Sequence, residues 1–265
     1  MTHASLSPDQ LPDLNVGRIH LGFPIVQAAL SGYSDWPMRV LARRHGASYT
    51  LCEVMLDQFL VALKDRKRTD HFLYLSDEEH PVGGQLMGAE PEQFARGAMK
   101  LVEAGFDVID INFGCPVKKV LGRCRGGFHL SQPEVALEIV RRTRETVPES
   151  IPVTLKMRRG MDDSAESRDK FFTILDGAFA AGVAAVTVHG RTVVQRYNGP
   201  SRWTFLREVK QHVGNRTILG LSLIHISEPT RLHELNTAMT GRRSCNAGTR
   251  KTCQECILIR VSTKP

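Results

Sequence analysis

Several features are scarce in this 265-residue sequence, and each scarcity excludes a class of protein. No run of about 18 apolar residues occurs, so no membrane-spanning helix is predicted. Residues 1–15 lack the basic and apolar regions of a signal peptide, and we therefore expect a cytoplasmic protein. The six cysteines are too sparse for the framework of a small secreted domain, and we expect free thiols. Aromatic residues make up only 6%, and no RNA-binding motif with interleaved aromatics is present.

The positive charge is uneven along the chain. Residues 1–220 carry 28 basic and 25 acidic side chains, whereas residues 221–265 carry seven and three. A mildly positive protein suits an RNA partner, but most such proteins bind no nucleic acid. Charge alone therefore does not decide the function.

Apolar strand-like runs alternate with helical patterns through residues 1–220. The expected strands are 23–29, 49–54, 81–87, 108–113, 153–158, 185–189 and 217–220, and the expected helices are 36–45, 91–104, 133–147, 164–181 and 201–212. This alternation predicts a parallel sheet. The runs are short and mostly apolar, as in strands that are covered on both faces.

Polar residues near the strand ends favour a closed barrel over a doubly wound sheet. They are Glu53, Gln85, Asn112, Lys156 and His189. A barrel brings all its carboxyl strand ends to one rim, where its active site lies, whereas a doubly wound sheet spreads them along an edge. We therefore expect an α/β fold, an incomplete (β/α)₈ TIM barrel with six to seven βα units in residues 1–220.

The pattern stops after Gly220. Residues 221–231 match one reading frame of a transposase-end adapter used in DNA library preparation, and residues 232–265 show no clear period. We expect residues 221–265 to be a non-native, disordered tail that leaves the barrel open. The Cys253-x-x-Cys256 pair in this tail resembles half of a zinc site, but no second pair exists, so we expect no metal.

The strongest chemical signal is the run Asp110-Ile-Asn-Phe-Gly-Cys-Pro-Val-Lys-Lys-Val120, which begins within the fourth strand. Asn112 offers an amide donor and acceptor at the barrel mouth, and Gly114 permits a sharp turn. Cys115 then lies on a loop near Lys118, where a thiol can act as an acid near neutral pH. The alternative for a lone cysteine is packing as a small buried hydrophobe.

This run resembles the Asn-x-Gly-Cys-Pro-x-x-Lys-Val signature of the tRNA-dihydrouridine synthase family, most closely its bacterial B-type branch. Four further segments resemble family motifs in the family's order: Ala28-Ala-Leu-Ser-Gly-Tyr-Ser-Asp35, Gln85-Leu-Met-Gly88, Leu155-Lys-Met-Arg-Arg-Gly160 and Val188-His-Gly-Arg-Thr192. The first departs from the usual Ala-Pro-Met-Ala-Gly-x-Thr-Asp at Ala29, Leu30 and Ser31, where the family contacts the flavin mainly through backbone groups. The resemblance covers about residues 20–220.

The resemblance implies an FMN-binding barrel that reduces uridine in tRNA to 5,6-dihydrouridine with NADPH as reductant. Hydride would pass from N5 of the flavin to C6 of uracil, and Cys115 would give a proton to C5. Cofactor contacts would come from Ala29, Leu30, Ser31, Gln85, Lys156 and His189, and substrate contacts from Asn112, Lys118, Arg158 and Arg191. Taken singly, a histidine such as His189 is more often a core residue, and surface salt bridges are an equal alternative for Arg158 and Arg191.

The family places the FMN phosphate on loops after strands seven and eight and adds a C-terminal helical tRNA-binding domain, all missing from this sequence. We therefore expect the chain to be unstable or to bind FMN weakly. Separately, we expect a monomer. Two other functions remain open: another FMN barrel oxidoreductase of the dihydroorotate dehydrogenase type, and an inactive, truncated RNA-binding relative.

Overall fold

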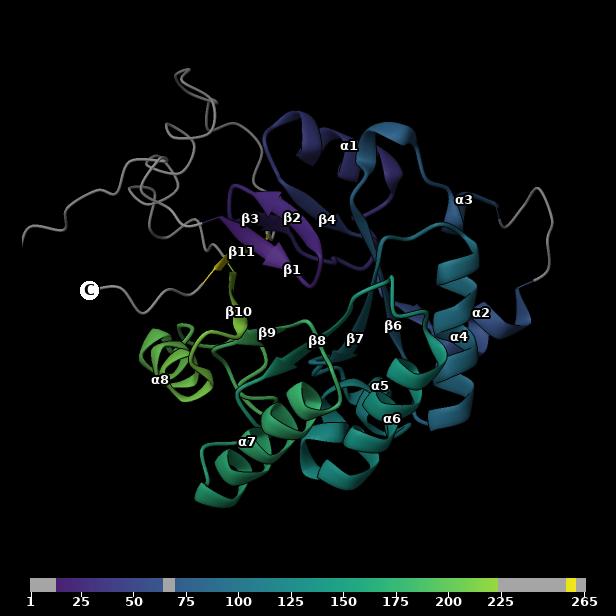
Figure 1. Ribbon diagram of the computed structural model, residues 1–265. Helices are drawn as coiled ribbons and strands as arrows, with labels where there is room; N and C mark the ends of the chain where they lie inside the picture. The colour runs from purple at the N-terminus through teal and green to yellow at the C-terminus, as the bar shows by residue number, and fades with distance from the viewer. Residues whose placement is uncertain (1–12, 64–69, 224–255, 261–265) are drawn as a thin grey trace, which may run out of the picture.

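The computed structural model describes residues 13–63, 70–223 and 256–260 (Figure 1). Its strands are β1 (Leu14–Val16), β2 (Ile19–Gly22), β3 (Ile25–Gln27), β4 (Tyr49–Leu51), β5 (Met55–Leu56), β6 (Val82–Met87), β7 (Val108–Phe113), β8 (Val153–Arg158), β9 (Ala185–His189), β10 (Thr217–Leu223) and β11 (Cys256–Arg260). Its α-helices are α1 (Trp36–Arg44), α2 (Asp57–Ala62), α3 (Asp70–Leu73), α4 (Pro91–Glu103), α5 (Lys118–Leu121), α6 (Pro133–Thr146), α7 (Ala165–Ala180) and α8 (Trp203–Val213), and the 3₁₀ helices are η2 (Asp77–Glu79) and η3 (Gly126–Ser131). Among the described helices, none has the length and apolar character needed to cross a bilayer.

The strands curl into a barrel. Strands β3, β4, β6, β7, β8, β9 and β10 are parallel neighbours in that order, and β5 pairs with the end of β6. The helices α4, α6, α7 and α8 lie outside the strands (Figure 1). Because strands and helices alternate around one curled parallel sheet, the fold is an α/β barrel of the TIM type.

The structure describes two stretches of strand after residue 220. Strand β10 continues to Leu223, and β11 pairs antiparallel with β10 on one side and with β3 on the other. The edges of β3 and β10 are therefore both paired, and the seven parallel strands match the six to seven βα units that the sequence predicted. Residues 224–255 and 261–265 lie outside the described residues, so the non-native, disordered tail expected for residues 221–265 stays a prediction.

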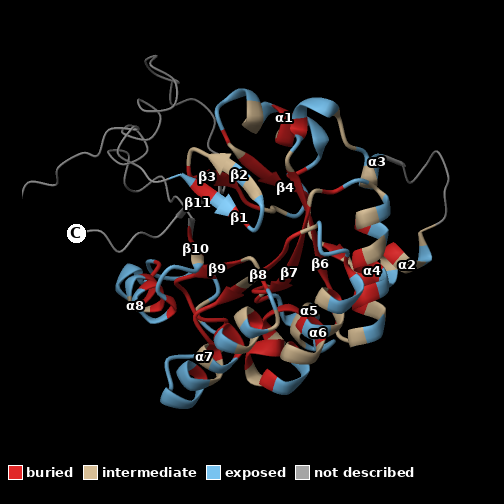
Figure 2. Ribbon diagram, viewed as in Figure 1, coloured by how far each residue is buried: buried red, intermediate tan, exposed pale blue. Residues whose placement is uncertain are grey.

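Alternating side chains of the strands enter two separate apolar clusters. On β7, Ile109, Ile111 and Phe113 join the cluster beneath the helices, whereas Val108 joins a cluster inside the barrel. Because successive side chains of a strand point to opposite faces, Asp110 must point inward with Val108. Figure 2 shows the consequence: most residues of strands β3, β4 and β6 to β9 are buried, and the outer helices are buried only on one side.

The hairpin of β1 and β2 covers the amino-terminal ends of the barrel strands. Leu14 and Val16 are buried in the inner cluster. The Thr217 hydroxyl at the start of β10 donates to the Asn15 carbonyl at 3.2 Å. Since apolar residues fill this end, the polar inner side chains are left near the opposite rim, where the carboxyl ends of the strands lie.

Candidate functional site

Strand register brings the inward polar residues of β6, β7 and β8 together. Gln85 is the register partner of Asp110, which is in turn the partner of Thr154. Two residues further along, Asn112 is the register partner of Lys156. The sequence predicted Gln85, Asn112 and Lys156 as site residues, but gave Asp110 and Thr154 no role.

A continuous series of hydrogen bonds joins four of these side chains and the backbone amide of Gly114. The Thr154 hydroxyl donates to Asp110 Oδ1 at 2.6 Å, and Gln85 Nε2 donates to Asp110 Oδ2 at 2.6 Å. Asn112 Nδ2 donates to Gln85 Oε1 at 2.7 Å, and the Gly114 amide donates to Asn112 Oδ1 at 2.9 Å. All are buried, so each polar atom needs such a partner. Burial raises the pKa of the Asp110 carboxyl, and the bonds from Thr154 and Gln85 oppose that rise.

Lys156 brings a positive charge to this network. Its Nζ atom would lie 3.2 Å from a Cβ atom placed on Gly114, and Asn112 Oδ1 would lie 3.8 Å from it. A larger residue at this position would therefore crowd the ammonium group. The Lys156 charge also favours the ionised form of Asp110 and holds down its pKa.

His189 is the last residue of β9 and is 3% exposed. Burial lowers its pKa to about 2, with further lowering by the charges of Arg158, Lys156 and Arg191. The imidazole is therefore neutral at physiological pH. An Arg191 Nη1 atom lies 3.4 Å from His189 Nε2, and because a guanidinium only donates, Nε2 accepts and Nδ1 carries the hydrogen.

The low pKa of His189 predicts a pH dependence of stability. In the unfolded chain histidine binds a proton below about pH 6.5, whereas the folded chain resists protonation down to about pH 2. Stability is therefore full above about pH 6.5 and falls as the pH drops below it. When the pH falls from 7 to 5, the free energy of unfolding of the parent chain should drop by about 2 kcal/mol more than that of the His189→Gln variant. Urea titrations of both proteins at the two pH values measure this difference. Equal losses in both proteins would show that His189 is not neutral in the folded chain.

Cys115 lies on the loop between β7 and α5 and is partly exposed. The Gly127 amide donates to its carbonyl at 3.0 Å, and Arg158 Nε donates to the neighbouring Gly114 carbonyl at 2.8 Å. Gly126 has φ of +58°, and a Cβ atom there would lie 2.8 Å from Cys115 Cβ. The loop is thus fixed from two sides. Lys118 is exposed on α5, beyond this packed segment.

Cys52, Cys115 and Cys124 are free thiols in the described structure. The Cys253 side chain falls outside the described residues, and Cys256 is described only as backbone of β11. Within the described ranges, no group of three or more His, Cys, Asp or Glu residues could hold a metal ion.

The loop after β3 carries the three predicted cofactor contacts that depart from the family pattern. Ala29 and Leu30 are half-buried and pack against the inner apolar cluster, whereas Ser31 is exposed. The Leu30 amide donates to the Ser34 hydroxyl at 2.8 Å, which fixes the turn. The structure places this loop at the carboxyl end of β3, and its contact with a flavin stays a prediction.

Arg158 and Arg191 are buried and hold the loop between β9 and α8. Arg158 Nη1 donates to the Thr192 carbonyl at 2.9 Å and to the Arg196 carbonyl at 2.6 Å, and Arg191 Nε donates to the Gly199 carbonyl at 2.6 Å. The two side chains are 2% and 1% exposed, so both lie beneath the surface. Their contact with tRNA phosphates stays a prediction.

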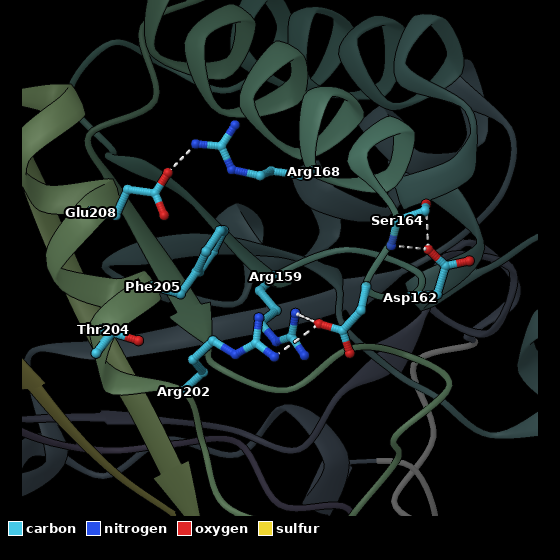
Figure 3. Close-up of a pocket in the computed structure, with 9 residues that line it drawn as sticks. Arg159, Asp162, Ser164, Arg168, Arg202, Thr204, Phe205 and Glu208 are labelled. Carbon is cyan, nitrogen blue, oxygen red and sulfur yellow. Dashed lines mark hydrogen bonds and ion pairs between the residues drawn. The ribbon is translucent and has the colours of Figure 1, made fainter.

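A polar pocket of about 260 Å³ lies where α7 and α8 begin (Figure 3). Three arginines line it, and each is matched by a carboxylate. Arg159 and Arg202 lie 2.6 and 3.1 Å from Asp163, and Arg168 pairs with Glu208. The sequence gave none of these residues a role. Because their charges are already compensated, the pocket offers little net attraction to a phosphate.

Comparison with known proteins identifies relatives of this barrel. A probable tRNA-dihydrouridine synthase of Rickettsia typhi is 34% identical over 200 residues, which are 76% of this chain and 59% of the relative. The tRNA-dihydrouridine synthase B of Xanthomonas axonopodis pv. citri is 32% identical over 199 residues, or 74% of this chain and 57% of the relative. The chain thus spans less than two thirds of the length of these relatives.

Solved structures support the fold. A 2-naphthoyl-CoA reductase complex matches with a TM-score of 0.58 at 10% identity, covering 78% of this chain and 45% of that one. Histamine dehydrogenase from Rhizobium sp. 4-9 matches with a TM-score of 0.58 at 12% identity, covering 78% of this chain and 41% of that one.

The dihydrouridine synthase (Dus) family model matches residues 26–220, which include every predicted site residue. The chain therefore belongs to the dihydrouridine synthase family.

Proposed function

We propose that this chain is the barrel part of an enzyme that reduces uridine in tRNA to 5,6-dihydrouridine, with FMN as cofactor and NADPH as reductant. The observation that carries the proposal is the placement of Lys156, Gln85 and Asn112 side by side within the barrel, next to the loop of Cys115. Family membership and the names of the relatives support the same reaction.

The polar side chains at this site match the polar edge of a flavin. That edge alternates N–H and C=O groups, which an amide such as Gln85 complements. The Gln85 side-chain amide has two N–H groups. It donates one of them to Asp110, and we propose that it offers the second to the flavin. The Lys156 ammonium beside Gly114 suits a group that gains negative charge on reduction. We propose that Gln85, Lys156 and neutral His189 hold the ring, with Ala29, Leu30 and Ser31 at its rim.

The hydride for C6 of the uracil ring would come from FMN held by these residues. Asn112 holds the uracil by its amide, and the Cys115 thiol gives a proton to C5, so that the C5=C6 double bond becomes a single bond. The thiolate then regains a proton from solvent. The uridine must leave its stack to reach Cys115, because a stacked base cannot enter the barrel mouth. Lys118, exposed on α5, is placed to contact the tRNA backbone.

The direct test combines the purified chain, FMN, NADPH and an in vitro tRNA transcript that contains no dihydrouridine. We expect NADPH oxidation that depends on both FMN and tRNA, and nucleosides whose mass shows the addition of two hydrogens to uridine. A reaction without FMN serves as the control. If the chain oxidises free dihydroorotate and leaves tRNA unchanged, the proposed substrate is wrong. If tRNA binds equally well without FMN and no product forms, the chain is an RNA-binding relative.

A further inference from the structure

The hydrogen-bond chain across β6, β7 and β8 has two ends of fixed polarity. At one end the Asp110 carboxylate, when ionised, can only accept hydrogen bonds. At the other end the backbone amide of Gly114 can only donate. Gln85 and Asn112, whose amides can each be turned over so that oxygen and nitrogen exchange places, lie between these two ends.

Only one orientation of each amide gives every polar atom in this series of hydrogen bonds a partner. If Gln85 were turned over, its Oε1 atom would face an oxygen of Asp110, and its Nε2 atom would face Nδ2 of Asn112. If Asn112 turned as well, its Nδ2 atom would face the N–H of Gly114. Each such contact leaves a buried polar atom without a partner, which costs about 1–3 kcal/mol.

Burial raises the pKa of the Asp110 carboxyl, and three neighbouring groups oppose that rise. The Thr154 hydroxyl and Gln85 Nε2 both donate to the carboxylate at 2.6 Å, and the positive charge of Lys156 favours the anion. These groups oppose the cost of burial for a side chain that is 2% exposed. Asp110 therefore acts as an acceptor from two sides.

We infer that Asp110 is a positioning residue, which sets the amide orientations of Gln85 and Asn112 and thereby the atoms that they present to the cofactor and the uracil. The inference deepens the proposed function and rests on it for the identity of these ligands. Asp110 itself contacts neither the proposed cofactor nor the uracil. Its effect passes through Gln85, which it contacts directly, and then through Asn112.

Three variants separate the hydrogen-bond acceptor from the charge and from simple packing. Asp110→Ala removes the acceptor. Asp110→Asn keeps one, because its Oδ1 atom can accept from Gln85 while its Nδ2 atom donates to the Thr154 hydroxyl. Thr154→Val is the matched control, since it removes a buried hydrogen bond from the same carboxylate but leaves the bond from Gln85 in place.

Two readouts are measured on each folded variant, one of which needs no cofactor. NMR of the ¹⁵N-labelled chain follows the exchange of the Gln85 side-chain amide protons with solvent. Fluorescence quenching gives the FMN dissociation constant. We expect Asp110→Ala to lose the protected Gln85 proton and to bind FMN about tenfold more weakly. Asp110→Asn and Thr154→Val should keep the protection and stay within about threefold of the parent affinity.

If Asp110→Ala does not fold, the double variant Asp110→Asn with Thr154→Val replaces it, because the introduced asparagine then has no acceptor for its Nδ2 atom unless Gln85 turns over. We expect this variant to behave as described for Asp110→Ala. Unchanged protection in Asp110→Ala or in the double variant would overturn the inference. If the Gln85 amide proton loses its protection in Asp110→Asn alone, the inference is also overturned. The negative charge of Asp110, and not its hydrogen-bond acceptor, would then fix the amide. If the parent chain takes up no FMN, the proposed function fails, while the amide protection still tests the role of Asp110.

Discussion

The Cys115→Ala variant should form dihydrouridine about 10²- to 10⁴-fold more slowly than the parent chain, while its FMN binding and its reduction by NADPH stay unchanged. The thiol is the proton donor in the proposed reaction, and alanine has no proton to give. Cys115 lies on the loop after β7, partly exposed, whereas Gln85 and Lys156 lie on the strands themselves. Removing the sulfur therefore leaves the proposed cofactor contacts in place.

Cys124→Ala is the matched control, since Cys124 is a free, exposed thiol nine positions further along the same segment. It should keep full activity. Product formation is followed by mass spectrometry of digested tRNA, and NADPH-dependent flavin reduction by the loss of flavin absorbance. Full activity in Cys115→Ala would remove this residue from the mechanism. Loss of FMN binding in the same variant would mean that Cys115 holds the cofactor site together.

Strands buried on both faces were the most predictable elements of the fold. β7, β8 and β9 have the bounds that their apolar runs predicted, because burial on both faces leaves little choice of residue at either end. The hairpin of β1 and β2 was not predicted, since three or four residues are too few to show a period. Strand β11 was missed because its place in the barrel depends on pairing with β3 and β10, which are distant in the sequence.

The site was predictable where a polar residue interrupts an apolar strand. Lys156 within Val-Thr-Leu-Lys-Met and Asn112 within Asp-Ile-Asn-Phe stand out in the sequence for that reason. The role of Asp110 was not predictable, because it depends on which residues of β6 and β8 lie opposite it in register. Arg158 shows the same limit: its partners are the carbonyl groups of Gly114 and Thr192, which are distant in the sequence and carry no local signal of the contact.

Replacing Lys156 by methionine should slow dihydrouridine formation by about 10²- to 10³-fold and make the bound flavin harder to reduce. Methionine keeps most of the length of the lysine side chain but removes its charge. The ammonium group lies beside Gly114, and in the proposed function it faces the part of the cofactor that gains negative charge on reduction. A fixed cation there stabilises the reduced form without any rearrangement, so its loss should lower the midpoint potential of the flavin as well as the rate.

Lys156→Arg and Lys100→Met separate the charge at this position from the general effect of losing a lysine. Lys100 lies on the outer surface of α4, where it pairs with Glu103, so its replacement should change neither the potential nor the rate. Lys156→Arg keeps the charge in a larger group and should retain the potential more fully than Lys156→Met. An unchanged midpoint potential in a folded Lys156→Met variant would show that the ammonium group does not act on the flavin. Lys156 would then be left with its electrostatic contacts to Asp110 and His189, and the proposed cofactor position would have to be moved.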